Sequence, residues 1–408
     1  MALIGSLIGK LLKHGSLTLI QPDGSRATYG PGGGKALTIR FADRKVAFDI
    51  ARNPRLGFGE AYMDGRVFIE DGTILDLLEL VMGSNRWEEG GDGRKALGKG
   101  KLKALGALLR RNDPRRSRKN VAHHYDIGNE LYELFLDNDL QYSCAYFTDP
   151  SNSLEQAQSD KKAHIAAKLA LSPGQRVLDI GCGWGGMALY LHKVAKVDVL
   201  GITLSENQLK VARERAAAAG VSDHVRFELI DYRQLEGEFD RIVSVGMFEH
   251  VGLADYETFF RACRRLLKRD GVMLLHTIGK LGKAAKGPDP FTDKYIFPGY
   301  HLPSLSQMAV ASEKARLISS DVETLRLHYA YTLRHWLERT TAARAKIEAM
   351  YDARFFRMWE FYLAGGIVMF ETGTACNYQV QYIRDRHAVP ITRDYMAKAE
   401  AKYRKAGV

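Results

Sequence analysis

The stretch Val177-Leu-Asp-Ile-Gly-Cys-Gly-Trp-Gly-Gly186 decides the fold of this chain. The apolar run Arg176–Ile180 has the composition of a buried strand, and the apolar periodicity from Met187 to Val194 predicts a helix after the glycines. The glycines permit a tight turn and let a ligand approach the backbone closely. A glycine-rich turn between a strand and a helix is the place where doubly wound α/β sheets bind ligands, beyond the carboxyl end of the strand.

The residues after this turn continue to alternate between strands and helices, which predicts a doubly wound, mostly parallel α/β sheet. A helix is expected from the capping box Ser-Glu-Asn-Gln at 205–208 to Ala219, with Gly220 as its stop. Four further strands are predicted at Val197–Ile202, Val225–Ile230, Arg241–Val245 and Val272–Ile278.

Composition divides the chain into an amino-terminal unit (residues 1–90), a basic linker (91–120) and a catalytic region (121–408). Glycine-rich turns separate short strand-like runs in the first unit. A long amphipathic helix rich in aromatic residues is expected from Leu325 to about Phe370. The strand-like runs are Leu17–Ile20, Leu37–Phe41 and Lys45–Asp49, and a helix is predicted over Ile74–Met82.

The 408 residues carry a formal net charge of +11 that is concentrated in the linker. Residues 91–120 contain eleven Lys and Arg against Asp92 and Asp113, a net charge of +9. Such a segment suits nucleic acid or acidic lipid headgroups, or it is a solvated linker without a partner. The amphipathic stretch Met1–Gly15 is either an ordinary first helix or a helix on a membrane surface.

The sequence lacks the features that are typical of membrane-spanning and disulfide-bonded proteins. It has no apolar run of about 18 residues, so no transmembrane helix is expected. Its four cysteines form no C-x-x-C pair and no export signal precedes them, which predicts reduced thiols in the cytosol. No metal site is expected.

The spacing of the glycines and the acid before them indicate which ligand the turn binds. A dinucleotide fingerprint reads G-x-G-x-x-G and has its acid about 20 residues later. Here the order is Gly181-x-Gly183-x-Gly185, and Asp179 precedes the turn. This arrangement resembles motif I of class I S-adenosylmethionine methyltransferases, in which the acid steers the amino-acid part of the cofactor. NAD binding and a purely structural turn remain as weaker alternatives.

Two later turns carry further candidate cofactor residues. After the second strand stands Thr203-Leu-Ser-Glu-Asn-Gln208, where methyltransferases usually place an acid for the ribose hydroxyls. Glu206 and Gln208 could both serve there, whereas Ser205 and Gln208 could equally act as helix caps only. The residues after the third strand, which are placed to reach the adenine, are Asp231 and Tyr232.

Several other segments, together with motif I, resemble the cyclopropane-fatty-acyl-phospholipid synthase family over residues 50 to about 390. The resemblance implies a seven-stranded Rossmann-like methyltransferase sheet, a smaller α+β amino-terminal domain linked to membrane or subunit contacts, and helical additions. A homodimer is therefore one option for its assembly. The segments are Gly57–Gly65, His123–Asn129, Tyr142–Phe147, Gly246–Gly252, His276–Gly279, Lys294–Pro298 and Tyr329–Leu333.

The resemblance also implies an activity and a set of site residues. The family transfers a methylene unit from S-adenosylmethionine onto the cis double bond of a phospholipid acyl chain, and its active site holds bicarbonate. Some members have a cysteine where this chain has Gly366, so that cysteine is not needed for the chemistry here. The matching cofactor residues are Tyr142, Ser143, Asp179, Gly181, Gly183, Thr203, Gln208 and Tyr232. The matching bicarbonate residues are Cys144, Glu249, His276, Ile278 and Tyr329.

The residues support this chemistry independently of the resemblance. An alkene is a poor nucleophile, so it must be aligned with the sulfonium methyl group, and the resulting carbocation must lose a proton to a base. Glu249 follows the fourth strand and His276 lies near the end of the fifth, so both face the same rim as motif I. Either residue could instead be structural, His276 as a hydrogen-bonded strand histidine and Glu249 as a helix-start carboxylate.

Competing functions stay open at this point. A lipid C-methyltransferase that makes methyl-branched acyl chains, or a small-amine N-methyltransferase, shares the same cofactor site. A nucleic-acid methyltransferase is disfavoured, because the chain has neither an Asn/Asp-Pro-Pro-Tyr-like segment nor a Pro-Cys pair. A non-catalytic lipid-binding relative is disfavoured by the intact motif I. The expected partners are unsaturated phospholipids and an anionic membrane surface, with the enzyme peripheral at the cytoplasmic face of the inner membrane.

Overall fold

The computed structural model describes residues 5, 8–9, 11–83, 86–90, 128–282, 287–373 and 375–407. The basic linker and the 123–127 part of the His123–Asn129 segment therefore lie outside the described residues, and so do seven of the fifteen residues of the first amphipathic stretch. The chain forms two compact units. Unit 1 combines the described part of Met1–Ala104 with Pro288–Pro298 and Tyr329–Ala375, and unit 2 contains Gly299–His328, Cys376–Val408 and the described part of Leu105–Gly287.

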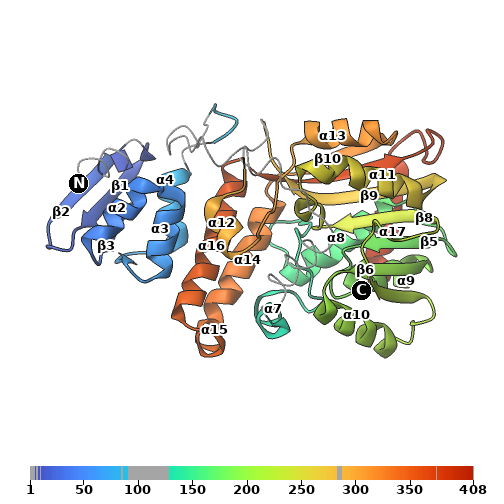
Figure 1. The fold of residues 1–408 in the computed structure, drawn as a ribbon, viewed down its shortest axis with the longest axis horizontal. Coiled ribbons are helices and arrows are strands. Elements are labelled where there is room, and N and C mark those ends of the chain that lie inside the picture. The colour runs from blue at the N-terminus through green and yellow to red at the C-terminus, as the bar shows by residue number, and fades with distance from the viewer. Residues whose placement is uncertain are drawn as a thin grey trace. The chain divides into compact units, whose positions relative to one another are not determined.

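Unit 2 is built on a sheet of seven strands in the order β10-β11-β9-β8-β5-β6-β7 (Figure 1). In the described part of this sheet only β11 runs antiparallel to its neighbours, β9 and β10. The predicted fold class, a mostly parallel doubly wound sheet, is confirmed. The strands are β5 (Arg176–Ile180), β6 (Asp198–Thr203), β7 (Val225–Leu229), β8 (Phe239–Val245), β9 (Leu267–Gly279), β10 (Ile318–Leu325) and β11 (Cys376–Ile383).

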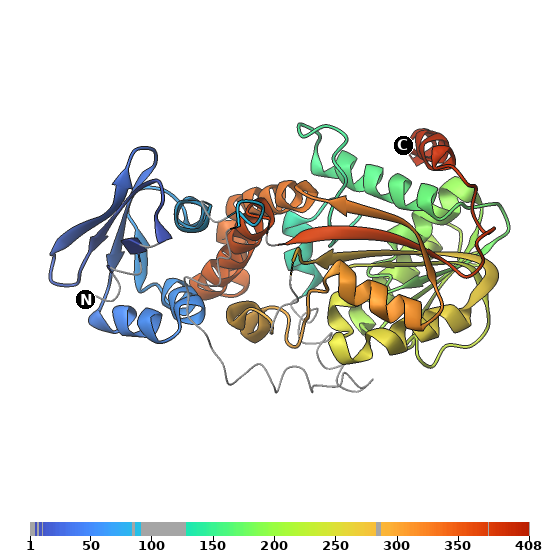
Figure 2. The ribbon, with the colours of Figure 1, turned by 90° about the horizontal axis from the view of Figure 1, so that it is seen from above.

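Helices cover both faces of this sheet, which Figure 2 shows from above. The central strands β5, β8 and β9 are buried over most of their length, as expected of parallel strands that are covered on both faces. One face packs against α8, α9, α10 and α17, and the other against α11 and α13. The helices are α7 (Asn129–Phe135), α8 (Leu154–Lys168), α9 (Gly186–Ala195), α10 (Glu206–Ala218), α11 (Tyr256–Leu266), α13 (Leu305–Lys314) and α17 (Asp394–Gly407).

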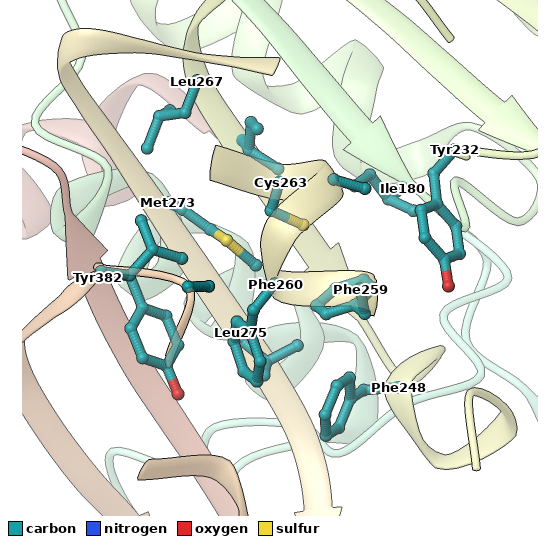
Figure 3. Close-up of a cluster of buried hydrophobic side chains, with 14 of the residues drawn as sticks. Ile180, Tyr232, Phe248, Phe259, Phe260, Cys263, Leu267, Met273, Leu275 and Tyr382 are labelled. Atoms are coloured by element: carbon teal, nitrogen blue, oxygen red, sulfur yellow. The ribbon is translucent and has the colours of Figure 1, made fainter. Parts of the chain in front are cut away.

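The core on the α11 face is rich in aromatic side chains (Figure 3). Phe259 and Phe260 of α11 lie against Phe248, and Phe260 meets Tyr382 of β11 edge-on at 5.1 Å between ring centroids. Such edge-to-face pairs add about 0.5–1.5 kcal/mol to the apolar area that they bury. This core fixes the segment just after β8, which carries Glu249.

Unit 1 contains a four-stranded sheet in the order β2-β1-β3-β4. Its core joins residues of this sheet to Ala364 and Val368 of α16, so a helix far along the chain completes the amino-terminal unit. Its elements are β1 (Gly15–Ile20), β2 (Arg26–Gly32), β3 (Ala36–Phe41), α2 (Arg44–Arg52), α3 (Pro54–Met63), β4 (Val67–Ile69), α4 (Ile74–Met82), α12 (Pro290–Tyr295), α14 (His328–Ala342), α15 (Arg344–Met350) and α16 (Ala353–Glu371).

Two predicted elements are wrong. Residues Lys45–Asp49 form no strand but lie in α2, because Asp43 caps the helix by accepting from the backbone of Lys45 and Val46. The expected single helix from Leu325 to about Phe370 is three helices. Leu325 ends β10, and Asp352 starts α16 by accepting from the backbone N–H of Phe355 at 2.6 Å.

The units also divide the chain differently from the sequence-based boundaries. Composition placed residues 121–408 in one region, whereas Pro288–Pro298 and Tyr329–Ala375 belong to unit 1. The reason is the apolar face of α16, which packs on α3 and α4. Among the described residues, no helix is both long and apolar enough to cross a bilayer.

Candidate active site

The turn after β5 has the backbone that its glycines predict. Gly181, Gly183 and Gly185 have φ of 84°, 54° and 86°, the left-handed region that favours glycine. A Cβ on Gly181 would lie 2.9 Å from the side chain of Met247, so the neighbouring segment leaves no space for one. The turn is tied to the next strand, because the backbone N–H groups of Gly181 and Cys182 both donate to the carbonyl oxygen of Ile202.

Asp179 ends β5 as a buried carboxyl, with 1% of its surface exposed. Its Oδ2 has no hydrogen-bond partner among the described residues. Burial raises the pKa of Asp179 from 3.8 to about 7, and the nearby charge of Lys161 opposes this rise. A buried polar atom without a partner is unusual, and at the end of a strand beside a glycine-rich turn such an oxygen is available to bind a ligand. The amino group of S-adenosylmethionine, a cation that also donates hydrogen bonds, fits this oxygen.

The segment with Tyr142 and Ser143 lies beside the end of β8. A Cβ on Gly246, which follows β8, would lie 3.8 Å from the Cβ of Ser143. Helix α8 fixes this segment: Lys161 Nζ donates to Ser143 Oγ at 2.9 Å, and Gln158 Nε2 donates to the Ser143 carbonyl at 3.0 Å. Ser143 therefore lies beside the residue that follows β8, and its contact with the cofactor remains a prediction.

Thr203 and Gln208 form a small hydrogen-bonded unit at the end of β6. The hydroxyl of Thr203 donates to Gln208 Oε1 at 3.0 Å and accepts from the backbone N–H of Ser205 at 3.1 Å. Ser205 caps α10 by accepting from the Gln208 backbone. The side chain of Gln208 is hydrogen-bonded to Thr203 and not to the backbone N–H of Ser205. Of the two hydrogen bonds that define the predicted capping box, only the one from the Gln208 backbone to the Ser205 side chain is present.

Asp231 and Tyr232 follow β7 but are already engaged with neighbours. Both carboxylate oxygens of Asp231 accept from the guanidinium of Arg233, at 2.8 and 2.6 Å. The ring of Tyr232 packs edge-on against Phe259 at 5.3 Å. The carboxylate of Asp231 is therefore neutralised by an ion pair, and the ring of Tyr232 is buried between Phe259 and the guanidinium of Arg233.

Glu249 is the second buried carboxyl of the rim. It lies in η1 (Phe248–His250), the short helix after β8, and 5% of its surface is exposed. Its Oε1 accepts from the backbone N–H of Ile278, and its Oε2 has no partner within the described part of the chain. Burial raises the pKa of Glu249 from 4.5 to about 7. At neutral pH this carboxyl can therefore hold a proton or release one.

His276 points towards β11, the strand that sequence reasoning did not predict. Its Nε2 lies 2.9 Å from the side-chain nitrogen of Asn377, and its Nδ1 lies 3.1 Å from that of Gln379. Burial lowers the pKa of His276 well below 6.5, so the ring is neutral. A neutral imidazole has one donor and one acceptor, so one of the two amides must turn its oxygen to the ring.

The remaining candidates for the bicarbonate site each have neighbours within their own unit. Cys144 is buried, and its thiol donates to the carbonyl oxygen of Ala145 at 3.3 Å. The N–H of Ile278 is taken by Glu249. Tyr329 belongs to unit 1, where its ring packs on Phe370 at 4.8 Å. Of the five predicted bicarbonate residues, Glu249 and Ile278 are in direct contact with each other, and the bicarbonate roles of all five remain predictions.

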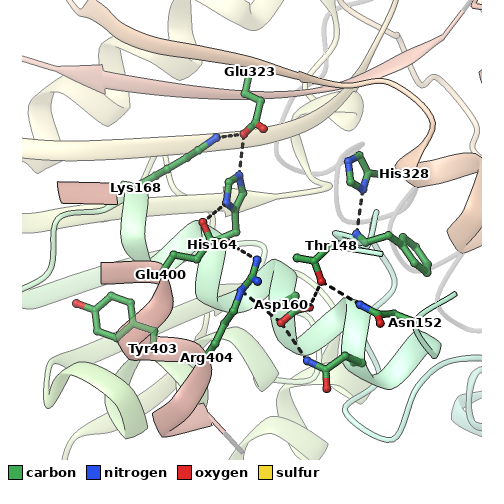
Figure 4. A network of polar contacts seen from close by, with 12 residues as sticks. Thr148, Asn152, Asp160, His164, Lys168, Glu323, His328, Glu400, Tyr403 and Arg404 are labelled. Atoms are coloured by element: carbon green, nitrogen blue, oxygen red, sulfur yellow. Dashed lines mark hydrogen bonds and ion pairs between the residues drawn. The ribbon is translucent and has the colours of Figure 1, made fainter. Parts of the chain in front are cut away.

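Sequence reasoning missed the inner face of α8. Polar side chains recur at helical spacing along it, at Gln158, Lys161, His164 and Lys168, and all four are buried. Figure 4 shows His164 between two carboxylates, with Glu323 of β10 at 2.7 Å and Glu400 of α17 at 2.9 Å. The sequence carried no signal for this burial, because polar residues occur on every side of α8 and polar residues on a helix are normally solvated.

Comparison with known proteins identifies relatives along most of the chain. Residues 112–380 match the family described as mycolic acid cyclopropane synthetase, and residues 10–86 match a domain of unknown function (DUF7884). The cyclopropane-fatty-acyl-phospholipid synthase of Escherichia coli (strain K12) is 41% identical over 341 residues, which cover 83% of this chain and 86% of the relative. A tuberculostearic acid methyltransferase of Mycobacterium tuberculosis is 33% identical over 407 residues, which cover 94% and 91%.

A solved structure agrees with these relatives. A mycolic acid cyclopropane synthase complexed with S-adenosylhomocysteine and CTAB has a TM-score of 0.62 and 34% identity, covering 65% of this chain and 97% of its own. The family match spans the described β5–β9 core and both buried carboxyls of the rim. The chain belongs to the mycolic acid cyclopropane synthetase family and is an S-adenosylmethionine-dependent methyltransferase of that family.

Proposed function

We propose that this chain transfers a methylene unit from S-adenosylmethionine to the cis double bond of a phospholipid acyl chain, which becomes a cyclopropane ring. One observation carries the proposal. Two buried carboxyls, Asp179 near the end of β5 and Glu249 just after β8, belong to adjacent parallel strands, and each has an oxygen without a partner among the described residues. The 41% identity to the Escherichia coli synthase supports the choice of phospholipid as acceptor.

The reaction sets two demands that the rim can meet. When bound, S-adenosylmethionine supplies an electrophilic methyl group on a positively charged sulfur. The π electrons of the alkene form a bond to that carbon while the carbon–sulfur bond breaks, and the neighbouring alkene carbon becomes a cation. A proton then leaves the new methyl group, and the released electron pair closes the ring. Asp179 would bind the amino group of the donor. Glu249 would lie beside the new methyl group, where the proton is removed.

We further propose that Glu249 holds bicarbonate, the ion implied by the family. The fit rests on Oε2 of Glu249, which lacks a partner in the described chain, and on a pKa near 7 that lets the protonated carboxyl donate to an anion. Bound there, the ion supplies a base for the departing proton. His276 does not fit as a direct ligand, because both ring nitrogens already meet amide groups of β11. Its neutral ring would instead fix the end of β9.

The bicarbonate proposal has a simple test. Turnover is expected to fall in degassed buffers free of carbonate and to recover when bicarbonate is added back. Turnover that is the same with and without bicarbonate would contradict this part of the proposal and leave Glu249 as the base itself.

The test of the main proposal is lipid mass spectrometry. The purified chain would be incubated with S-adenosylmethionine and liposomes of unsaturated phosphatidylethanolamine or phosphatidylglycerol. The expected product is heavier by one methylene and resists ozonolysis, because the double bond is gone. No change in the lipid, with measurable binding of S-adenosylhomocysteine, would mean that the acceptor is a soluble molecule such as a small amine.

A second product class is favoured by one observation. The tuberculostearic acid methyltransferase aligns with 94% of this chain, so a fatty-acid methyltransferase shares nearly its whole length. A different fate of the carbocation would give a methyl-branched chain from the same donor and acceptor. A lipid product that is heavier by one methylene but is still cleaved by ozone, or that contains a methyl-branched chain, would support this alternative and contradict ring closure.

We also propose that the enzyme works at an anionic membrane surface, at the cytoplasmic face. The support is the net charge of +9 in residues 91–120. Electrostatic attraction between exposed charges weakens strongly at high ionic strength. Binding to phosphatidylglycerol liposomes is therefore expected to fall when salt is raised to about 0.5 M. Binding that is unaffected by salt would contradict an electrostatic contribution.

A further inference from the structure

His164 lies on the inner face of α8 between two carboxylates, one from β10 and one from α17 (Figure 4). Its Nε2 lies 2.7 Å from Glu323 Oε2, and its Nδ1 lies 2.9 Å from Glu400 Oε2. A carboxylate only accepts hydrogen bonds, so both ring nitrogens must donate, and a ring that donates twice is a positively charged imidazolium. Each carboxylate is also paired with a further cation that favours its ionised form, Glu323 with Lys168 and Glu400 with Arg404. The hydrogen bonds therefore require a protonated His164.

The ring of His164 also belongs to a stack of three rings. Tyr146 lies nearly parallel to it, with ring centroids 4.0 Å apart and an angle of 11° between the planes. His328 stacks on Tyr146 as well, at 4.8 Å and 7°, and two rings this close to one ring must lie on its opposite faces. The Nδ1 of His328 accepts from the backbone N–H of Phe147 at 3.0 Å, so this nitrogen carries no proton and His328 is neutral. Tyr146 is thus held between a cationic and a neutral imidazole, and an aromatic face attracts the cation.

Helix α8 holds the Tyr142–Phe147 segment at two points. Near the start of the segment, two side chains of α8 donate to Ser143. Near its end, the backbone N–H of Tyr146 donates to the carbonyl oxygen of Ala157 at 3.0 Å, and His164 packs on the ring. Loss of the stack would therefore loosen the Tyr146 end of the segment while the Ser143 end stays bound.

We propose that His164 is a positioning residue of the cofactor site: its imidazolium, held by carboxylates of β10 and α17, keeps the Tyr146 ring in place and thereby fixes the Tyr142–Phe147 segment. The inference rests on the proposed function, since the contacts of Tyr142 and Ser143 with S-adenosylmethionine are predictions of that function. It goes beyond that function because it assigns a role to a histidine that touches neither the donor nor the acceptor.

The positioning role implies a pH dependence with a definite sign. Burial favours the neutral ring, but the hydrogen bonds to Glu323 and Glu400 outweigh it and raise the pKa of His164 above 6.5. A group whose pKa is raised by folding stabilises the folded state at lower pH, and this contribution is lost as pH rises through the raised pKa. Affinity for the cofactor should therefore weaken on the alkaline side. The other charged or titratable groups that face the stack are Asp160 and Lys168 of α8, Asp321 of β10, His276 of β9, Arg404 of α17 and Arg326.

The test compares S-adenosylhomocysteine binding by the native full chain and by His164→Arg, measured by calorimetry from pH 6.5 to 9. Arginine keeps its charge over this range and can stack on Tyr146 while it donates to carboxylates. The ratio of the two affinities cancels the titration of the ligand, so the native chain is expected to lose about tenfold relative to the variant as pH rises. His224→Gln is the matched control and should follow the native curve, because it removes an exposed histidine that stacks on His192 and contacts Asp198.

Two further measurements apply if arginine does not fit at this position. Glu400→Gln removes one of the two carboxylates, so the loss of affinity should occur at lower pH than in the native chain. NMR of nitrogen-15-labelled histidines at pH 7 should show a proton on both ring nitrogens of His164, identified by the signal that is missing from His164→Gln.

A neutral His164 at pH 7 would overturn the proposal and leave the residue as a packing residue. So would a native pH profile that matches that of His164→Arg or of Glu400→Gln. Formation of the lipid product at pH 7 tests the proposed function separately, so a failure of that function and a failure of this inference are distinguishable.

Discussion

Asp179 and Glu249 are two buried carboxyls on one rim, and they differ in what surrounds them. Burial raises the pKa of each to about 7. Asp179 lies in the field of a buried ammonium, Lys161, which favours its ionised form. Glu249 instead accepts from a neutral donor, the backbone N–H of Ile278.

Because of this difference, the carboxyl ends of two neighbouring strands can carry out two separate tasks. A carboxyl stabilised by a nearby cation is suited to bind a positively charged group. A carboxyl stabilised by dipoles alone, with a pKa near the working pH, is suited to hold or pass a proton. We therefore expect substitutions at Asp179 to act on donor binding and substitutions at Glu249 to act on turnover.

The largest expected effect belongs to Asp179→Asn. The variant keeps the shape of the side chain but removes the charge that would bind the donor's amino group. Affinity for S-adenosylhomocysteine, measured by calorimetry at pH 8, should fall by about 100-fold or more, since charge-assisted hydrogen bonds are the strong ones. An affinity within a few-fold of the native value would remove Asp179 from the donor site.

Glu249→Gln should give the opposite pattern. Turnover with unsaturated liposomes is expected to fall by about 100-fold, because loss of proton transfer typically costs this much. Affinity for S-adenosylhomocysteine should stay within about threefold of native, since the amide can still accept from Ile278. If Glu249→Gln lost both donor binding and turnover, the two carboxyls would not have separate tasks.

The third expected effect concerns stability without ligand. Asp179 has a pKa in the folded chain above that of the unfolded chain, so its contribution to stability falls as pH rises from about 4 to about 7 and is constant above. Asp179→Asn removes this penalty. The variant should therefore gain about 1–3 kcal/mol relative to native between pH 5 and pH 8. Urea unfolding at the two pH values measures this gain, and equal differences at both would contradict a buried, shifted carboxyl.

The smallest expected effect is that of Cys144→Ala. The thiol is buried and donates only weakly, to the carbonyl of Ala145. If Cys144 merely packs beside the segment that carries Ser143, kcat should stay within about threefold of native. Loss of activity by about 100-fold or more would indicate a direct chemical role for the sulfur.

The sequence was sufficient for the parts of the site that follow apolar strands. The run before Gly181 and the position of Glu249 after β8 could both be placed, because buried parallel strands are continuous apolar runs. Strand β11 was missed although Asn377, Gln379 and Gln381 alternate with apolar residues, a pattern that predicts a strand with one exposed face. The pattern could not indicate that this face is buried as well. All three are buried because the polar face meets His276 and the carbonyl of Lys168.

The same reason hid the lysines of α8 and the extent of unit 1. A lysine on a helix is normally solvated, so Lys161 attracted no attention until its burial was visible. The apolar faces of α14–α16 indicate burial but do not specify the surface that they pack against. The burial of Lys161 and the packing of α14–α16 thus depend on contacts with residues far away in the sequence, which a local sequence pattern does not contain.

The most direct test of the central claim uses S-adenosylmethionine with a fully deuterated methyl group and liposomes of a monounsaturated phospholipid. Ring closure predicts a product that resists ozonolysis and retains two of the three deuterium atoms, because the third leaves as the proton. A product that retains all three, or one whose chain ozone still cleaves, would contradict cyclopropane formation by this enzyme.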